Sequence, residues 1–418
     1  MAASFSAQIK IDDVKKLGLP ILYIETENGK KIRSKTDYRK ASWTLESPGE
    51  NALSGKCKIR GRGNTTWETR ELYKKPYLLK LNNPESLLGM AKSEKWVLMA
   101  NTADKTSLRN SYAEYLARNI FTSQTWIPSS KFIILYINGR FEGLYGLTEK
   151  VEMTEGRVFP PSLSDDNPSI SAEQNPDFSN SFLAEVGRVK PDEWHFETQQ
   201  KITVTIQQKT ESNDSVEMYR LYQEKIQKAE NVLFSEDFAD QKTGWQKYLD
   251  KDSFIDWYLI NEFTKNHDAA FQSSCYFFYE QNSGKFFMGP IWDFDISCGN
   301  ISYDNCEKPE GEFINSKAWY KRLFEDENFK KAVHKRFLEK NDELYESFAW
   351  IQEQADKLVP AIKINDAVWK NIGHRQWPHA PGWKNRKTYQ AEVDYMIDFL
   401  EKRRIWLENE YSMDGENK

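Results

Sequence analysis

The chain has 418 residues, of which 39% are hydrophobic and 29% charged, and its net charge is −5. This balance excludes a disordered chain and any overall attraction for nucleic acid, and no apolar run approaches the roughly 18 residues of a membrane span. We therefore expect a globular protein of two or three compact units, or one domain with insertions, with no nucleic-acid partner and no membrane span.

Residues 1–152 are predicted to form a strand-rich N-terminal lobe with one helix. Alternating apolar residues over 74–81 are typical of a strand, and the Asn-Gly pair at 138–139 is a type I′ turn signal between two further apolar runs. Asp104 is a candidate N-cap for a helix over 105–120, because the apolar residues that follow recur at helical spacing.

Residues 153–215 are predicted to hold an insertion and a strand pair near the hinge between two lobes. Their first part, 154–180, is rich in Pro, Ser, Asp and Asn, a composition typical of a mobile insertion. Residues 216–418 are predicted to form a mainly helical C-terminal lobe, with Asp252 as one N-cap and a strand hairpin over 275–295. Together these parts indicate a two-lobed protein of the α+β class.

The most informative segment is GKFFMGPIWDFDISCGN, residues 284–300, in which an apolar run ends in Asp293 and Asp295. On a strand this spacing points both carboxylates to one side, where like charges repel unless a cation lies between them. Mg²⁺ prefers such oxygen ligands, together with substrate phosphates. The alternative is a strand end whose acids are capped by lysine or by backbone amides.

Two features of the N-terminal half are suited to binding an anion. RGRGNTTW, residues 60–67, could cradle phosphate oxygens with its backbone amides and could add charge from Arg60 or Arg62. Lys80 shares a strand face with apolar neighbours and could reach a buried anion. The alternatives are an ordinary turn at the glycines and a lysine that extends to solvent.

Helical spacing places Arg109 at the edge of the apolar arc of the 105–120 helix, where it can reach the sheet, and Glu114 on the far side. Asp268 follows the end of the next helix and precedes the hairpin, so it can meet Asp293 in one cleft. His267 beside it is more typical of a capping or surface histidine.

The chain lacks the signatures of several enzyme classes. No GxSxG elbow, HExxH helix, CxxC pair or GxxxxGK[ST] loop is present. Of the four cysteines, Cys57 and Cys275 are predicted to be buried thiols, whereas Cys298 and Cys306 could pair or stay free.

In chain order, several segments resemble the spore-coat-protein-H (CotH) family of atypical kinases. They are RGRGNTTW, KKPYLLKL, DKTSLRNSYAEYLAR, YINGRFEGLYGLTEKVE, YLINEFTKNHDAAFQSSCYFFYE and GKFFMGPIWDFDISCGN, and the resemblance extends over about residues 15 to 410. It implies a distant protein-kinase-like fold and Mg²⁺-dependent transfer of the ATP γ-phosphate to a serine or threonine of a protein substrate. It also implies an extracellular or cell-surface location in a bacterium, although the sequence also permits a cytoplasmic one.

The resemblance assigns roles to individual residues. Asp268 would be the catalytic acid, and the metal ligands would be Asp293, Asp295 and Ser274. The nucleotide would be bound by Arg60, Gly61, Gly63, Asn64, Lys80, Arg109 and Glu149.

Two departures from the family leave alternatives open. Ser273 and Ser274 stand where many relatives carry a metal-binding asparagine, and Gly187 stands where relatives often have an acid. One alternative is a pseudokinase or surface-associated scaffold, in which Trp369, Trp377 and Trp383 would stack on sugars rather than pack between helices. Another is metal-dependent hydrolysis of a phosphate ester.

Overall fold

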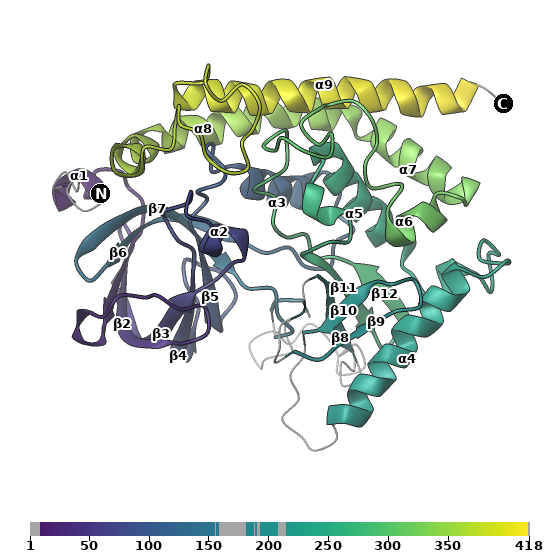
Figure 1. Cartoon of the computed structure of the whole chain (residues 1–418), viewed down its shortest axis with the longest axis horizontal. Helices are drawn as coiled ribbons and strands as arrows, with labels where there is room; N and C mark the ends of the chain where they lie inside the picture. The colour runs from purple at the N-terminus through teal and green to yellow at the C-terminus, as the bar shows by residue number, and fades with distance from the viewer. Residues whose placement is uncertain are drawn as a thin grey trace.

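The computed structural model describes residues 9–154, 156–158, 181–187, 189, 193–207 and 215–416. Figure 1 shows a β-barrel at one side, a mainly helical part at the other, and a smaller sheet below the helices. The predicted α+β class is confirmed. Most of the predicted insertion at 154–180 lies outside the described residues, so its proposed mobility stays a prediction.

Seven strands close the barrel in the order β1-β2-β3-β4-β5-β7-β6. Neighbours are antiparallel except β1 and β6, which pair in parallel. Alternate side chains such as Leu79, Leu98 and Leu147 fill the interior, as the period-two pattern of strands requires. The strands are β1 (Ile21–Thr26), β2 (Arg39–Glu46), β3 (Leu53–Gly61), β4 (Tyr77–Glu85), β5 (Ser93–Met99), β6 (Ser130–Ile137) and β7 (Arg140–Glu149).

The predicted hairpin around residues 138–139 is confirmed as β6 and β7. Asn138 and Gly139 have φ values of 52° and 70°, the left-handed pair that a type I′ turn requires. The short helix α1 (Ile11–Lys15) precedes β1, whereas the 3-10 turn η1 (Glu27–Gly29) and the short helix α2 (Thr65–Glu68) lie in connections between strands of the barrel.

Helix α3 (Arg109–Asn119) connects β5 to β6 and packs against α5. The prediction that it begins at 105 was wrong, because the Asp104 carboxylate holds residues 104–107 in a separate turn. Its Oδ1 accepts from the Thr106 amide at 3.0 Å, and Ser107 has a φ of +60° that no helix allows. Asp104 reaches the helix through Arg109, whose amide donates to Asp104 Oδ2 at 2.9 Å and whose guanidinium pairs with the same carboxylate.

The second sheet has the order β12-β11-β8-β10-β9 and is antiparallel throughout. Its strands are β8 (Phe182–Val186), β9 (His195–Glu197), β10 (Thr203–Ile206), β11 (Cys275–Glu280) and β12 (Lys285–Met288). The predicted hairpin in 275–295 is therefore confirmed. Because β11 and β12 run in opposite directions, the segment before β11 and the segment after β12 meet at one end of the sheet.

The helical part begins at α4 (Ser215–Leu233), close to the predicted residue 216. Helix α5 (Lys251–Thr264) is buried on almost every side. Its N-cap is Asp250, which accepts from the Ser253 amide at 2.9 Å, and not Asp252 as predicted; Asp252 instead pairs with Arg336. The remaining elements are η3 (Trp245–Lys247), η4 (His267–Ala269), α6 (Ala318–Leu323), α7 (Glu327–Glu339), α8 (Asn341–Trp369) and α9 (Tyr389–Glu416).

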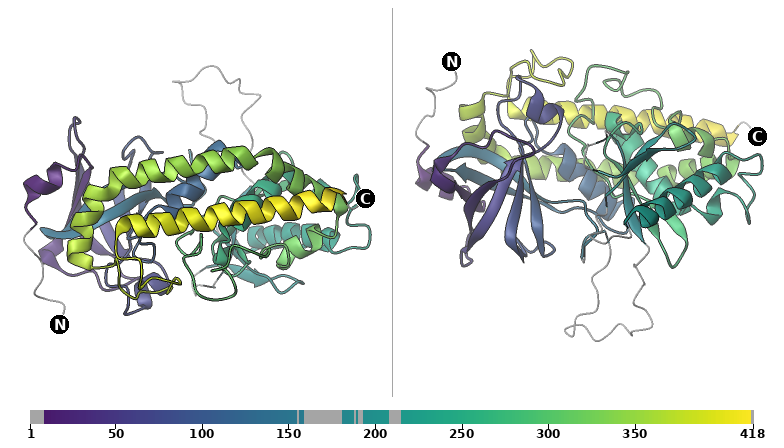
Figure 2. Two further views of the ribbon diagram at one scale, coloured as in Figure 1. Left: turned by 90° about the horizontal axis from the view of Figure 1, so that it is seen from above. Right: turned by 60° about the horizontal axis from the view of Figure 1, so that its bottom comes forward.

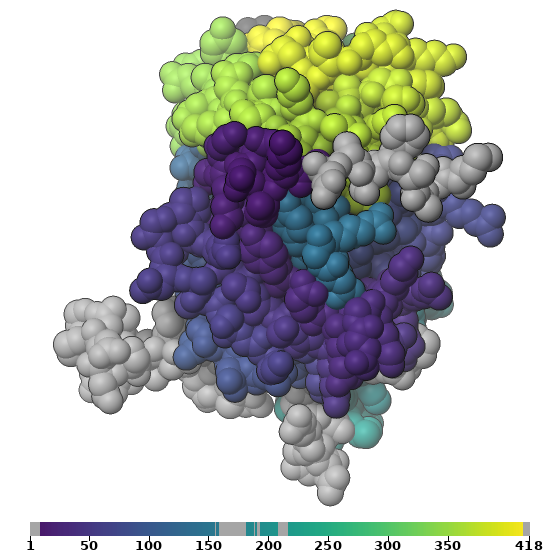
Figure 3. All heavy atoms as spheres, turned by 90° about the vertical axis from the view of Figure 1, so that its left-hand side faces the viewer, coloured from purple at the N-terminus to yellow at the C-terminus, as the bar shows by residue number. Residues whose placement is uncertain are grey.

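The two longest helices, α8 and α9, join the barrel to the rest of the molecule. The view from above shows them antiparallel and side by side along the whole length of the protein (Figure 2). Figure 3 shows them above the purple N-terminal strands of the barrel. At the barrel end, the Trp369 indole donates to the Glu142 carbonyl at 2.8 Å, and at the other end Arg403 forms a fully buried ion pair with Glu262.

None of the described helices combines the length and the apolar composition that crossing a bilayer would require.

Candidate functional site

The β11–β12 hairpin brings the acids of the chain together. Asp268 lies in η4, directly after α5 ends at Lys265 in the left-handed conformation. Asp293 and Asp295 lie just beyond β12, in a loop where Asp293 has a φ of +66°. The two segments lie at the same end of the hairpin, and the Asn266 side-chain amide donates to the Asp293 carbonyl at 3.4 Å.

Helices α3 and α5 hold the loop that carries the two acids. From α3, the Asn110 side chain accepts from the Phe294 amide at 2.8 Å, and Arg109 Nε donates to the Ser297 carbonyl at 2.9 Å. From α5, the Thr264 carbonyl accepts from the Cys298 amide at 2.7 Å. The position of the acids is therefore fixed from both sides of the loop.

The acids disfavour one another's ionisation. Burial raises the pKa of Asp293 to about 6, the Asp268 charge adds to the shift, and Arg62 and the Ser274 hydroxyl oppose it. Burial is also the main reason why the pKa of Asp295 lies well above its ordinary value. The charges of Asp293 and Asp268 raise that pKa further. Clustered carboxylates of this kind favour a bound cation.

Arg62 is the cation that faces this cluster. Its guanidinium lies 5.7 Å from the centre of the Trp292 ring, and Nη1 lies 3.2 Å from the Met99 sulfur. It lowers the pKa of both Asp293 and Asp295. Arg62 therefore places a half-buried positive charge beside the acids.

The glycine loop is a tight turn between β3 and α2. A Cβ on Gly61 would lie 2.4 Å from the Trp67 ring, and one on Gly63 would lie 2.3 Å from Thr66 Oγ1. Gly63 also has a φ of +85°. Both glycines are thus required by local packing, and Asn64 beside them is exposed.

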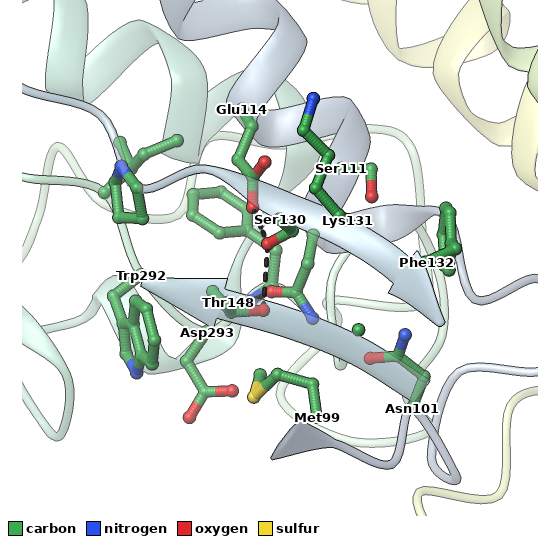
Figure 4. Close-up of a pocket in the computed structure, with 15 residues that line it drawn as sticks. Met99, Asn101, Ser111, Glu114, Ser130, Lys131, Phe132, Thr148, Trp292 and Asp293 are labelled. Carbon is green, nitrogen blue, oxygen red and sulfur yellow. Dashed lines mark hydrogen bonds between the residues drawn. The ribbon is translucent and has the colours of Figure 1, made fainter. Parts of the chain in front are cut away.

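A pocket of about 480 Å³, open to solvent, adjoins the loop that carries Asp293 and Asp295, which we call the acid loop. Figure 4 shows Asp293 and Met99 at its lower side and Glu114, Ser130 and Thr148 above them. Ser130 Oγ donates to Glu114 at 2.6 Å and lies 3.0 Å from Thr148 Oγ1. The pocket therefore presents both apolar and hydroxyl-bearing side chains next to Asp293.

A model of the family described as CotH kinase protein matches residues 59–407, which is most of the chain. The chain belongs to the CotH kinase family. A search of curated proteins found no match.

Within this CotH-family chain, the structure brings four of the predicted site residues together: Asp268, Asp293, Asp295 and Ser274. The Ser274 hydroxyl lies 3.5 Å from Asp293 Oδ2. The proposed catalytic acid and metal ligands thus share one surface.

Lys80 and Arg60 lie elsewhere. Leu79 and Leu81 fill the barrel, so Lys80 points outward, where it is 42% exposed and 3.5 Å from Glu94. Arg60 donates to the Lys35 carbonyl and lies 5.2 Å from the Tyr38 ring centre. The buried lysine of the same segment is Lys74, whose pKa burial lowers to about 7 and whose Nζ donates to the Ala100 carbonyl at 3.0 Å.

Arg109 and Glu149 are buried and already occupied by protein partners. Arg109 binds Asp104 and the acid loop, and Glu149 accepts from the amides of Ala91 at 2.8 Å and Ser129 at 2.9 Å. Both residues position backbone segments next to the site.

Sequence analysis missed two acids near the site. Glu114 was predicted to lie on the far side of its helix, but it faces β6, and burial raises its pKa to about 7. Glu185 of β8 contributes to the raised pKa of Asp293. The alternation of side chains along a strand could have indicated the position of Glu185. Ala184 and Val186 pack into the core, so Glu185 lies on the opposite face of the strand.

All four cysteines are free and buried, so the Cys298–Cys306 disulfide left open by the sequence does not form. Of the three tryptophans considered for sugar stacking, Trp377 packs against the core, Trp369 is bonded to β7, and Trp383 is half-buried among lysines.

The donor set suits a hard divalent cation. Carboxylate and hydroxyl oxygens surround the site, and Asp293 and Asp295 carry raised pKa values. Within the described ranges, however, no three His, Cys, Asp or Glu side chains are close enough to hold a metal ion on their own. Asp293 and Asp295 are the carboxylates that could hold Mg²⁺, an ion that is usually bound by one or two carboxylates together with water and phosphate oxygens.

Proposed function

We propose that this protein is an ATP- and Mg²⁺-dependent kinase that transfers the γ-phosphate to a serine or threonine hydroxyl of a protein substrate. The observation that carries the proposal is the convergence of Asp268 and Asp293 at one end of the β11–β12 hairpin, opposite Arg62. Phosphoryl transfer needs a metal site, positioned positive charge and an oriented nucleophile, and these residues can supply that set.

Each residue has a distinct task in the proposed reaction. Asp293 would hold the metal, with Asp295 and Ser274 as further oxygen donors. Bound there, Mg²⁺ would neutralise charge on the phosphates. Arg62 would contact phosphate oxygens, and the amides next to Gly63 could add hydrogen bonds.

Asp268 would orient the acceptor hydroxyl and receive its proton. As the hydroxyl oxygen bonds to the γ-phosphorus, the bond from that phosphorus to the β–γ bridging oxygen breaks and ADP leaves. His267, next to Asp268, can steady the segment that carries this acid, because its Nε2 lies 2.7 Å from Asp304 and its Nδ1 lies 3.7 Å from Asp268.

The pocket beside the acid loop would receive the nucleoside part of ATP. Met99, Phe132 and Phe294 supply apolar contacts, while Ser130 and Thr148 supply hydroxyl groups. The pocket then takes the place of Glu149 in nucleotide binding, because the Glu149 carboxylate is held by two backbone amides of the protein.

In this proposal the barrel is the strand-rich lobe of a distant kinase-like fold, and the helical part is the second lobe. The predicted divisions at residues 152 and 215 would then mark the hinge region. We also propose an extracellular or cell-surface location in a bacterium.

A labelling assay tests the proposal. Wild-type protein, Asp293→Asn and a control, Asp398→Asn on the exposed face of α9, are incubated with γ-labelled ATP, Mg²⁺ and a panel of acceptor proteins. We expect Asp293→Asn to lower phosphate transfer by about 10³-fold, because metal-ion stabilisation of the transition state is lost. The control should match wild type. Equal transfer by all three proteins would overturn the assignment.

The same assay separates the two other candidate functions. Release of inorganic phosphate without labelled protein would indicate hydrolysis. The scaffold is favoured by one observation, the serines at 273 and 274 in place of asparagine, and it predicts no ATP binding in calorimetry with any divalent cation.

A further inference from the structure

The connection between α8 and α9, residues 370–388, is strongly basic and contains no acid. In a chain with a net charge of −5, this segment carries only positive or neutral side chains. Its charged residues are Lys370, Arg375, Lys384, Arg386 and Lys387, together with His374 and His379. We call it the 370–388 loop.

The 370–388 loop reaches both sides of the candidate site. On the barrel side, His379 Nε2 lies 2.8 Å from Glu71, which follows the glycine loop and α2. On the other side, the Pro378 carbonyl accepts from the Ser302 hydroxyl at 3.3 Å, and Ser302 belongs to the segment after the acid loop. Figures 1 and 2 show the loop beside α2. It therefore lies at the rim of the candidate site.

Three cations surround a single tryptophan in the loop. The Nζ atoms of Lys105, Lys384 and Lys387 each lie 5.9 Å from the centre of the Trp383 ring. Lys105 is neutralised by Glu392 at 3.4 Å. Lys384 and Lys387 are exposed, and no carboxylate of the described residues pairs with either, although Lys387 Nζ donates to the Gly373 carbonyl at 3.2 Å.

The other acids around the loop are already engaged. Glu71 pairs with His379 and Arg375, Glu392 pairs with Arg386 at 2.7 Å, and Asp366 accepts from two amides of the loop. The loop is thus held in place by its own ion pairs, and the two lysines remain as uncompensated charge. Two like charges that each lie 5.9 Å from the centre of the same ring repel, so an anionic partner at this position would relieve the repulsion.

We propose that the 370–388 loop binds an acidic segment of the protein substrate, with Lys384 and Lys387 as the contacts. This inference rests on the proposed kinase function, because it places the acidic segment next to the acceptor hydroxyl. Trp383 supports the site by fixing the lysine side chains over its ring. The resulting preference is for a serine or threonine flanked by Asp or Glu.

A binding experiment without ATP tests the loop separately from catalysis. The probe is a short fluorescent peptide in which glutamates flank one serine, and its partner peptide has glutamine in place of glutamate. Binding is measured by anisotropy for wild type, Lys384→Gln/Lys387→Gln and a control of equal charge, Lys331→Gln/Lys335→Gln on α7.

Wild type should prefer the glutamate peptide, and the loop variant should lose about fivefold in affinity for it, as expected from two partly exposed charge pairs. The control should lose nothing. Equal weakening in both variants, or no preference for the glutamate peptide, would overturn the inference. If the peptide binds as expected but no phosphate is transferred, the proposed function fails while the binding site stands.

Discussion

Arg109 donates to Asp104 at 2.5 Å, and both side chains are almost completely buried. The same guanidinium donates to the Ser297 carbonyl at 2.9 Å and to the Cys298 carbonyl at 3.3 Å. One side chain thus joins the start of α3 to the loop that carries the candidate metal ligands. The geometry of the site depends on this ion pair.

Arg109→Met should lower the free energy of unfolding by about 3–5 kcal/mol, because it leaves the Asp104 charge buried without a partner. Urea denaturation monitored by tryptophan fluorescence measures the change. The double variant Asp104→Asn/Arg109→Met should recover part of the loss, since the orphaned charge is then removed. A cost below about 1 kcal/mol for the single variant would contradict a structural role for the pair.

Glu114 predicts a pH dependence of stability. Its pKa is about 7 in the folded protein and 4.5 in the unfolded chain, so between these values the folded state keeps a proton that the unfolded state releases. The free energy of unfolding therefore falls as pH rises through this window and levels off above pH 7. After screening by solvent, the half-buried Glu114 carboxyl should lower the free energy of unfolding by about 1–2 kcal/mol across this window.

Glu114→Gln should remove this slope while keeping an oxygen for Ser130. Relative to wild type it should gain stability between pH 5 and pH 8, as measured by urea denaturation at both values. Glu353→Gln, on the exposed face of α8, is the control and should change nothing. A difference between Glu114→Gln and wild type that does not vary with pH would count against the raised pKa.

Gly146 allows a test of the nucleoside pocket. The three atoms nearest to a Cβ built on it all belong to pocket-lining residues: Thr148 Oγ1 at 3.5 Å, Met99 Cβ at 3.6 Å and Asn101 Nδ2 at 3.9 Å. Gly146→Val should therefore fill the pocket without disturbing the barrel and weaken ATP binding by about tenfold or more. Calorimetry measures the affinity, and a thermal melt like that of wild type shows that the fold is kept. Unchanged affinity would place the nucleoside elsewhere.

Local patterns in the sequence predicted the two hairpins. The hairpins at 138–139 and in 275–295 follow from turn residues between alternating runs, and the second of these is what brings Asp268 and Asp293 together. Strand β5 was missed, because it is identified by its pairing with β4 and β7 rather than by its own pattern.

Errors arose where a distant contact decides the outcome. Strand alternation correctly separated Lys80 from Leu79, but it could not show that the face of Lys80 is solvent-exposed. The sequence alone does not favour Arg62 over Arg60 as the residue that binds an anion. The contacts of Arg62 with Trp292 and Met99 identify it as the cation beside the acids. Helix starts at α3 and α5 were misplaced because each depends on a specific cap or turn.

The most direct test of the proposed function is the rate of phosphate transfer by Asp268→Asn at saturating Mg²⁺ and ATP. Because this substitution keeps the shape of the side chain but removes the proton acceptor, transfer should fall by about 10²–10⁴-fold. ATP binding measured by calorimetry should stay unchanged. A variant that transfers phosphate at the wild-type rate would contradict the role of Asp268 and the reaction proposed for this site.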